Sequence, residues 1–162
     1  DVARGLLPWM RLGYFRSSGD RDPADPTHGT FFPLLPTSRM YSRFPFYNLM
    51  NLEDLSASVT VRPGSRTTIR GDLHRLQLSE ESDGWYVGGG AFRKDDFGYS
   101  MRPSNLSRGL ATVMDLSVDL RVTSHWAVGG YGGYAMARRV VETIYPTKPG
   151  GGFGYFELEY RR

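Results

Sequence analysis

Residues 110–122 read LATVMDLSVDLRV, and apolar and polar side chains alternate through most of this stretch. The apolar positions are Leu110, Met114, Leu116, Val118, Leu120 and Val122. The positions between the later ones are polar: Asp115, Ser117, Asp119 and Arg121. A helix would scatter these residues around its circumference, whereas a strand sorts them onto two faces. The pattern therefore predicts a β-strand with one apolar and one polar face.

The same alternation extends to other segments of the chain. Residues 54–62, DLSASVTVR, place Leu55, Ala57, Val59 and Val61 on one face. In residues 67–78 the alternation loses phase near Arg75. In residues 126–138 the glycines and tyrosines leave it ambiguous which side chains share a face. In all, we expect strands near 7–16, 53–62, 67–78, 109–122, 126–138 and 152–161.

The links between the expected strands alternate between short and long. Residues 63–66 and 123–125 suit tight turns, whereas the other links span about 17–52, 79–108 and 139–151. Outer-membrane barrels have this arrangement, with short periplasmic turns and longer extracellular loops. The sequence thus predicts an all-β fold, an antiparallel transmembrane β-barrel in which 1–162 is a single segment. A soluble sugar-binding β-sandwich remains the alternative, because alternation alone does not distinguish lipid from core.

Length and composition exclude several classes of protein. The chain has 162 residues, which suggests one domain or a piece of one, and it has no cysteine, which excludes thiol catalysis and cysteine–zinc sites. No run of apolar residues is long enough for a transmembrane helix. The net charge is only +3, and arginines alternate with acids, so we expect no nucleic-acid partner.

If the polar face lines a wet lumen, charged side chains of both signs line it. We expect this pore lining to include Arg11, Asp54, Arg62, Arg70, Asp72, His74, Asp115, Asp119, Arg121, Glu157 and Glu159. Arginine forks clasp carboxylates in a bidentate manner, which suits an acidic saccharide. The alternative is that these charges form ion pairs that hold adjacent strands in register.

Sites for a metal or for catalysis are weakly indicated. Asp20, Asp22 and Asp25 could gather oxygens around calcium, but they lack the spacing of an EF-hand and also suit simple turns. The histidines are far apart and no nucleophile-elbow motif is present, so we expect no enzyme and no other cofactor. The three glycines in WYVGGGAF, 85–92, favour a loop tip or a constriction folded into the lumen.

Several segments resemble the alginate export family of outer-membrane porins. They are LGYFRSSGDRDPADPTHGTFFPLLPT at 12–37, RMYSRFPFYNLMN at 39–51, LHRLQL at 73–78, WYVGGGAF at 85–92 and FGYFELEYR at 153–161. The resemblance runs over essentially the whole chain and corresponds to the C-terminal part of the family's barrel.

The resemblance implies a bacterial outer-membrane channel for alginate-like polyanions, in a single barrel of roughly eighteen strands. Six strands are too few for closure, so we expect the remaining strands to come from the same or other chains, with outer-membrane lipid around them. We expect passive diffusion of a hydrophilic solute of the anionic polysaccharide type. Two further alternatives are a structural barrel subunit of a larger envelope assembly and a small eight-stranded barrel with extra strands near 39–47 and 84–92, against which Pro45 and the glycine triplet argue.

Overall fold

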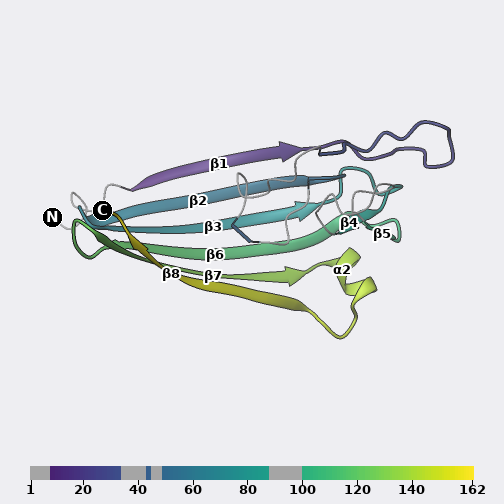
Figure 1. Cartoon of the computed structure of the whole chain (residues 1–162). Helices are drawn as coiled ribbons and strands as arrows, with labels where there is room; N and C mark the ends of the chain where they lie inside the picture. The colour runs from purple at the N-terminus through teal and green to yellow at the C-terminus, as the bar shows by residue number, and fades with distance from the viewer. Residues whose placement is uncertain (1–7, 34–42, 45–48, 88–99) are drawn as a thin grey trace.

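The computed structural model describes residues 8–33, 43–44, 49–87 and 100–162. The chain is all-β except for one short helix in this part (Figure 1). The elements are β1 Trp9–Arg16, β2 Glu53–Gly64, β3 Thr67–Gln77, β4 Trp85–Val87, β5 Ser100–Arg102, β6 Gly109–Arg121, β7 Trp126–Ala137, α2 Arg139–Ile144 and β8 Gly150–Tyr160. Among the described residues, no helix is both long and apolar enough to cross a bilayer.

Six long strands form one antiparallel sheet in the order β1-β2-β3-β6-β7-β8. The strands lie side by side in chain order, with the short turns at one end and the long links at the other (Figure 1). We call these the short-turn end and the long-link end. The described sheet is not closed, because β1 and β8 each pair with one neighbour only.

The strand register sorts the side chains onto two faces. On one, which we call the apolar face, Met10, Val59, Leu116 and their neighbours follow one another across the sheet. This face carries no charged residue from the Trp126–Tyr160 pair near the short-turn end up to the level of Leu12 and Gly152. Its side chains are strongly exposed: Leu12 is 81% and Phe156 is 72% exposed. Such a surface far exceeds the apolar patches of soluble monomers.

No second layer covers the apolar face in the described part of the chain, although a β-sandwich would need one. The only other described sheet is the β4–β5 hairpin, and Trp85 of that hairpin packs with residues of the opposite face. An exposed, charge-free band flanked by aromatic residues is typical of a lipid-facing barrel wall. Trp126 and Tyr160 contribute to that flank, with ring centroids 4.9 Å apart.

Three details of the sequence interpretation need correction or completion. The alternation does not lose phase at Arg75: it continues, and Arg75 lies on the apolar face between Leu55 and Thr112. Pairing with Thr60 places Trp9 on the polar face, whereas Trp126 lies on the apolar face. The ambiguous facing of β7 is settled by its pairing, which puts Tyr134 on the apolar face and Tyr131 on the other.

At the long-link end, the opposite face is covered by protein. Its residues Leu76, Ala111, Val113 and Ala135 are buried together with residues from the long links. These are Phe44, Leu52, Leu78, Trp85, Val140 and Val141. The helix α2 contributes the two valines and lies beside β6 and β7. Thus the face that the sequence predicted to be polar is polar over most of its length and apolar under the long links.

Candidate functional site: the polar face of the sheet

Most of the charged side chains expected to line a pore share one face, which we call the polar face. Pairing across the sheet places ten of them on it: Arg11, Asp54, Arg70, Asp72, His74, Asp115, Asp119, Arg121, Glu157 and Glu159. Arg62 lies in the irregular stretch of β2 between Val61 and Gly64, beside the turn. The strand alternation explains this grouping, because side chains two residues apart point to the same side of a sheet.

The middle of the polar face holds a compact group of charges. The Arg70 guanidinium donates two hydrogen bonds to the Asp72 carboxylate, at 2.7 and 2.6 Å. Asp115 is paired directly with Asp72 across the strands. The Asp115 side chain and the Tyr131 hydroxyl both lie over Gly133. Like charges placed directly opposite destabilise a sheet unless a cation lies nearby. Arg70 therefore balances part of an acidic cluster and does not stand as a free cation.

A buried histidine–carboxylate pair lies toward the long-link end. His74 Nδ1 and Asp54 Oδ2 are 2.8 Å apart, and both side chains are almost fully buried. Ser56 is paired with His74 across the strands, so the fold does bring a serine, a histidine and an aspartate together. The Ser56 hydroxyl, however, donates to the Gly13 carbonyl at 3.4 Å, and His74 is only 3% exposed. A hydrolase needs a nucleophile bonded to the base and open to substrate, which this arrangement does not provide.

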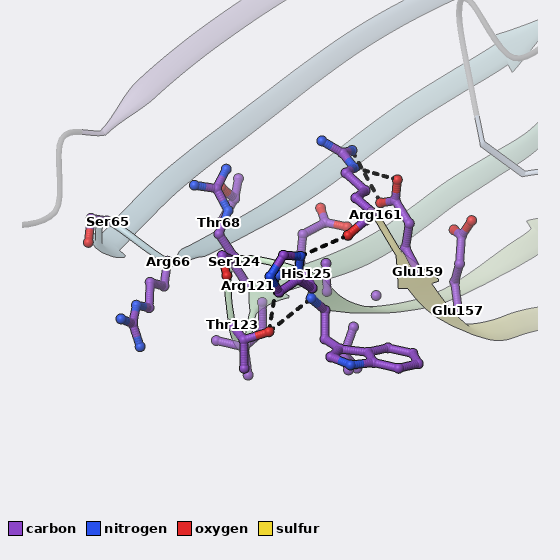
Figure 2. A pocket seen from close by; sticks show the side chains of 16 residues that line it. Ser65, Arg66, Thr68, Arg121, Thr123, Ser124, His125, Glu157, Glu159 and Arg161 are labelled. Carbon is purple, nitrogen blue, oxygen red and sulfur yellow. Dashed lines mark hydrogen bonds and ion pairs between the residues drawn. The ribbon is translucent and has the colours of Figure 1, made fainter.

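The short-turn end of the polar face is hollowed and carries charges of both signs (Figure 2). The hollow has a volume of about 560 Å³ and includes Arg66, Arg121 and Glu157 in its lining. The guanidinium groups of Arg66 and Arg121 form no ion pair with any described residue. The charges of these two arginines are therefore not neutralised by a described carboxylate.

Arg161 adds a paired cation at the same hollow. Its guanidinium donates to the Glu159 carboxylate at 2.7 and 3.2 Å. This hydrogen-bonded carboxylate raises the pKa of Arg161 above its ordinary value. Its backbone carbonyl lies 3.1 Å from His125 Nδ1, which joins the end of β8 to the β6–β7 turn. The pair therefore contributes little net charge to this end of the face.

Toward the long-link end, aromatic side chains follow one another along the polar face of β7 and β8. Tyr131 and Tyr155 are stacked with centroids 5.1 Å apart, and Phe153 lies 6.1 Å from each. Phe44 meets Phe153 edge to face at 6.4 Å. This group was not predictable from the period-two pattern of β7, because the glycines of that strand obscure the pattern. The signal was present in β8, where Tyr155 shares the alternate positions of Glu157 and Glu159.

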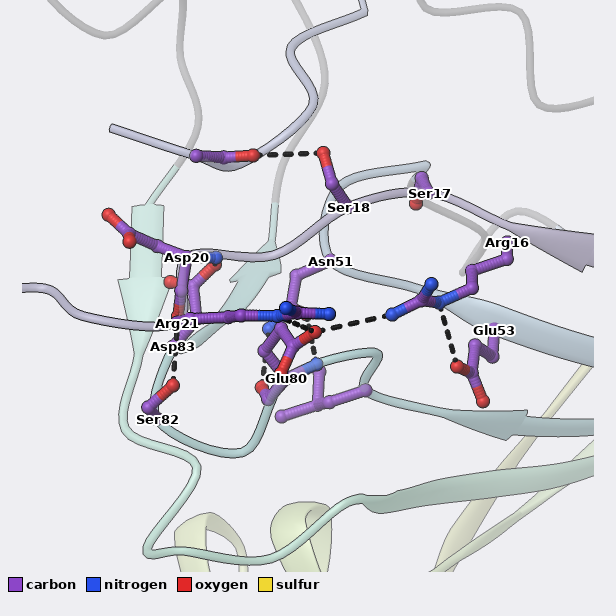
Figure 3. Close-up of polar contacts among 12 residues, drawn as sticks. Arg16, Ser17, Ser18, Asp20, Arg21, Asn51, Glu53, Glu80, Ser82 and Asp83 are labelled. Atoms are coloured by element: carbon purple, nitrogen blue, oxygen red, sulfur yellow. Dashed lines mark hydrogen bonds and ion pairs between the residues drawn. The ribbon is translucent and has the colours of Figure 1, made fainter. Parts of the chain in front are cut away.

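The long links are tied together by a polar network (Figure 3). Glu80 accepts hydrogen bonds from Arg16 at 3.2 Å and from Arg21 at 3.1 Å, while Arg16 also donates to Glu53 at 3.1 Å. The Asn51 side chain donates to the carbonyls of Glu80 and Gly84, each at 3.0 Å. The network holds the 17–52 link against the 79–108 link.

Asp83 is the most connected carboxylate of the long links. It accepts hydrogen bonds from the Asp20 backbone N–H at 3.0 Å and from the Thr30 hydroxyl at 2.6 Å. The Tyr86 hydroxyl donates to its other oxygen at 2.9 Å. Burial, together with Asp83, raises the pKa of Tyr86 to about 12. These bonds join Asp20 and Thr30 of the first long link to Asp83 in the second, so Asp83 acts as an anchor for the links.

The three aspartates considered for calcium behave as turn formers in this structure. Asp20, Asp22 and Asp25 each accept a hydrogen bond from the backbone N–H two residues further on. Such bonds are characteristic of Asx turns. Among the described residues, no three His, Cys, Asp or Glu side chains lie close enough together to hold a metal ion. The calcium site stays a prediction with no structural support in this part of the chain.

The glycine triplet 88–90 lies outside the described residues, as do most of 39–47. Trp85, at the start of the same motif, is 7% exposed and belongs to the buried cluster on the polar face. β4 pairs with β5 and is not a strand of the large sheet. The described part of 84–92 thus packs over the polar face and adds no strand to the wall.

Comparison with known proteins identifies one family. The alginate export family model matches residues 3–134. No curated protein and no solved structure matches the chain. The matched range covers β1 through most of β7, including the charged group in the middle of the polar face.

Proposed function

Since the chain belongs to the alginate export family, we propose that it forms part of the wall of an outer-membrane channel that passes a hydrophilic solute of the anionic polysaccharide type by passive diffusion. The polar face lines the lumen and the apolar face meets lipid. The edges of β1 and β8 pair with the remaining barrel strands, from the same or another chain. The family is one of transport proteins, and the proposal requires no covalent chemistry and no cofactor.

One observation carries the proposal: the two faces of a single sheet differ completely in charge. The apolar face has no charged residue through the membrane-sized band, whereas the polar face carries arginines and carboxylates at the same levels. A wall with lipid on one side and water on the other requires this division. Discrimination among solutes would then rest on lumen width, field and contacts with the polar face.

A structural role is the second candidate, favoured by the coverage of the polar face at the long-link end. Phe44, Trp85 and the α2 valines pack over β3, β6 and β7. In a barrel whose lumen is filled in this way, the chain would act as a subunit of a larger envelope assembly with no transport role. Conductance separates the two functions directly.

The test uses the full-length polypeptide in planar bilayers, with ion selectivity measured from the reversal potential in a salt gradient. Arg121→Gln removes a cation from the polar face and is expected to shift selectivity toward cations, and Glu157→Gln to shift it toward anions. Arg70→Gln is expected to act in the same direction as Arg121→Gln, and more strongly if it frees Asp72.

Arg75→Gln is the matched control, because Arg75 lies on the apolar face of the same sheet. Its selectivity should equal that of the parent protein. Absence of any conductance in the parent would favour the structural role. Conductance that responds equally to Arg75→Gln and Arg121→Gln would contradict the assignment of the two faces.

A further inference from the structure

The aromatic strip of the last hairpin is more exposed than its packing role requires. The strip consists of Tyr131, Phe153 and Tyr155. Tyr131 lies on β7, inside the sheet, and is 5% exposed. Phe153 and Tyr155 are 42% and 41% exposed on the same face. Phe153 and Tyr155 are not needed to cover Gly133, because the Tyr131 hydroxyl and a Phe44 ring carbon each already lie 2.9 Å from the position that a Cβ on Gly133 would take. The rings of Phe153 and Tyr155 are thus only partly covered by the described residues.

A hollow adjoins this strip at the long-link end. It has a volume of about 460 Å³, and Phe44, Trp85, Val141, Tyr145, Lys148 and Phe153 are among the residues that line it. Its walls are mainly aromatic and aliphatic, and Lys148 is the single cationic residue in the lining. The Lys148 side chain is exposed and forms no ion pair with any described residue. Phe153 belongs to both the strip and the hollow, so the two form one continuous surface.

The chemistry of this surface fits sugar rings. A pyranose has two faces of C–H groups, which pack on aromatic rings, and an edge of hydroxyls, which needs polar partners. Aromatic walls with a few placed polar groups are the usual composition of small-ligand sites. A uronate ring adds one carboxylate at its edge, which an ammonium group binds by a charge-assisted hydrogen bond. The strip supplies flat apolar faces in a row, and Lys148 supplies the ammonium.

Charge alone does not explain selection of a polyanion by the described polar face. The carboxylates of Asp54, Asp72, Asp115, Asp119, Glu157 and Glu159 outnumber its arginines, and Arg70 is engaged by Asp72. Long-range attraction of an anionic chain therefore needs help from short-range contacts. Ring stacking is such a contact, and it distinguishes a polysaccharide from other polymers of the same charge.

We infer that the polar face of the β7–β8 hairpin holds a carbohydrate subsite, in which pyranose rings stack on Phe153 and Tyr155 and Lys148 binds a ring carboxylate. The inference rests on the proposed function, since it places the subsite on the path of the transported solute. It assigns ring recognition to the aromatic strip and the preference for a charged sugar to Lys148.

Binding to the full-length protein in detergent tests the subsite without any need for transport. Trp85 lines the hollow, so its fluorescence reports on binding when every other tryptophan is replaced by phenylalanine. The probes are a short hexuronate oligomer, a neutral hexose oligomer of equal length, and polyglutamate of equal charge. We expect saturable binding of both sugars, tighter for the hexuronate, and none of polyglutamate.

Variants of the strip then separate ring stacking from charge. Phe153→Leu and Tyr155→Leu are each expected to lower the affinity for both oligosaccharides about tenfold. Tyr155→Trp should retain binding, because it keeps a flat ring. Lys148→Gln should weaken the hexuronate only. Phe156→Leu and Tyr134→Leu, which alter aromatics of the apolar face on the same two strands, should leave binding unchanged, and heat-modifiable gel mobility checks that each variant folds.

Two results would overturn the subsite: equal sugar affinity in Phe153→Leu, Tyr155→Leu and the parent, or polyglutamate binding as tightly as the hexuronate. The fate of the proposed function is read separately in the bilayer experiment. A parent protein that binds sugars as described but conducts no ions would remove the transport function and keep the subsite. A conducting protein whose sugar binding ignores the strip would do the reverse.

Discussion

Asp83 illustrates how single residues order the long links. Asp83 is 6% exposed, and its carboxylate accepts hydrogen bonds from the Asp20 backbone N–H and from the Thr30 and Tyr86 hydroxyls. A buried carboxylate is stable only when such donors replace its water. A glycine is needed at position 19, in the SSGD segment, because a Cβ there would lie 2.0 Å from Asn51 Oδ1 in the same link and 3.0 Å from Glu80 Cβ in the second long link. The family-like residues of the first long link thus serve contacts with the second long link.

The Tyr86–Asp83 contact makes a pH-dependent prediction. The folded pKa of Tyr86, about 12, lies above its ordinary value of 10.0, because burial and Asp83 disfavour the phenolate. A raised pKa means that the contact contributes its full stability below pH 10, and that this contribution is lost as the pH rises through about 12. Tyrosinate absorbance in the near-ultraviolet, compared with Tyr86→Phe, should show one phenol that titrates late. A difference spectrum that titrates near the ordinary tyrosine value would contradict the contact.

In strand β7, a glycine makes room for the side chain of a neighbouring tyrosine. In β7, Gly133 lies on the polar face beneath Phe44 and the Tyr131 hydroxyl, each 2.9 Å from the place of an added Cβ. Gly132, its neighbour on the apolar face, has nothing within 4 Å of that place. Glycine is therefore required by packing at position 133, whereas at position 132 it leaves open space on the apolar face.

The two neighbouring glycines offer a matched pair of substitutions. Gly133→Ala must displace Phe44 or Tyr131, and we expect it to lower the free energy of unfolding by about 1 to 3 kcal/mol. Gly132→Ala meets open space and should change it by less than about 0.5 kcal/mol. Urea titration of the full-length protein in detergent, followed by tryptophan fluorescence, measures both. Equal effects of the two substitutions would show that the aromatic strip does not pack on Gly133.

The strands and their faces could be read from the sequence wherever the alternation was clean. In β2, β6 and β8 a period of two assigns each side chain to a face, because a sheet allows no other arrangement. In β7 the glycines do not show which side chains share a face, and only the pairing with β6 and β8 assigns them. Arg75 interrupted the apparent alternation because it is a charged residue on the apolar face, at the long-link end of that face.

The contents of the long links could not be read in the same way. Trp85 and Phe44 lie far apart in the sequence, yet both pack over Ala111 and Val113 on the polar face. No local period encodes such a contact, because it depends on how two links fold back over the sheet. For the same reason, the charged residues of the face were predictable as a set, whereas the aromatic strip and its hollow were not.

At the scale of the whole molecule, the six strands of the described sheet make an open wall, in which β1 and β8 each have one described neighbour. Unpaired strand edges are not tolerated in lipid, because their N–H and C=O groups find no water there. The proposed channel function of this alginate export family member therefore requires a larger barrel, completed by further strands along β1 and β8. The polar face of this chain would then be one sector of the lumen.

The division between lipid and lumen can be measured residue by residue, because the chain contains no cysteine. Single cysteines at 115–120 of β6, spin-labelled in the full-length protein in bilayers, report collisions with dissolved oxygen and with a water-soluble nickel chelate. If the apolar face meets lipid, we expect strict alternation: labels replacing Leu116, Val118 and Leu120 meet oxygen, and the label replacing Asp119 meets the chelate most strongly. Labels that reach the chelate equally at all six positions, or show no period of two, would contradict a wall with lipid on one side and water on the other.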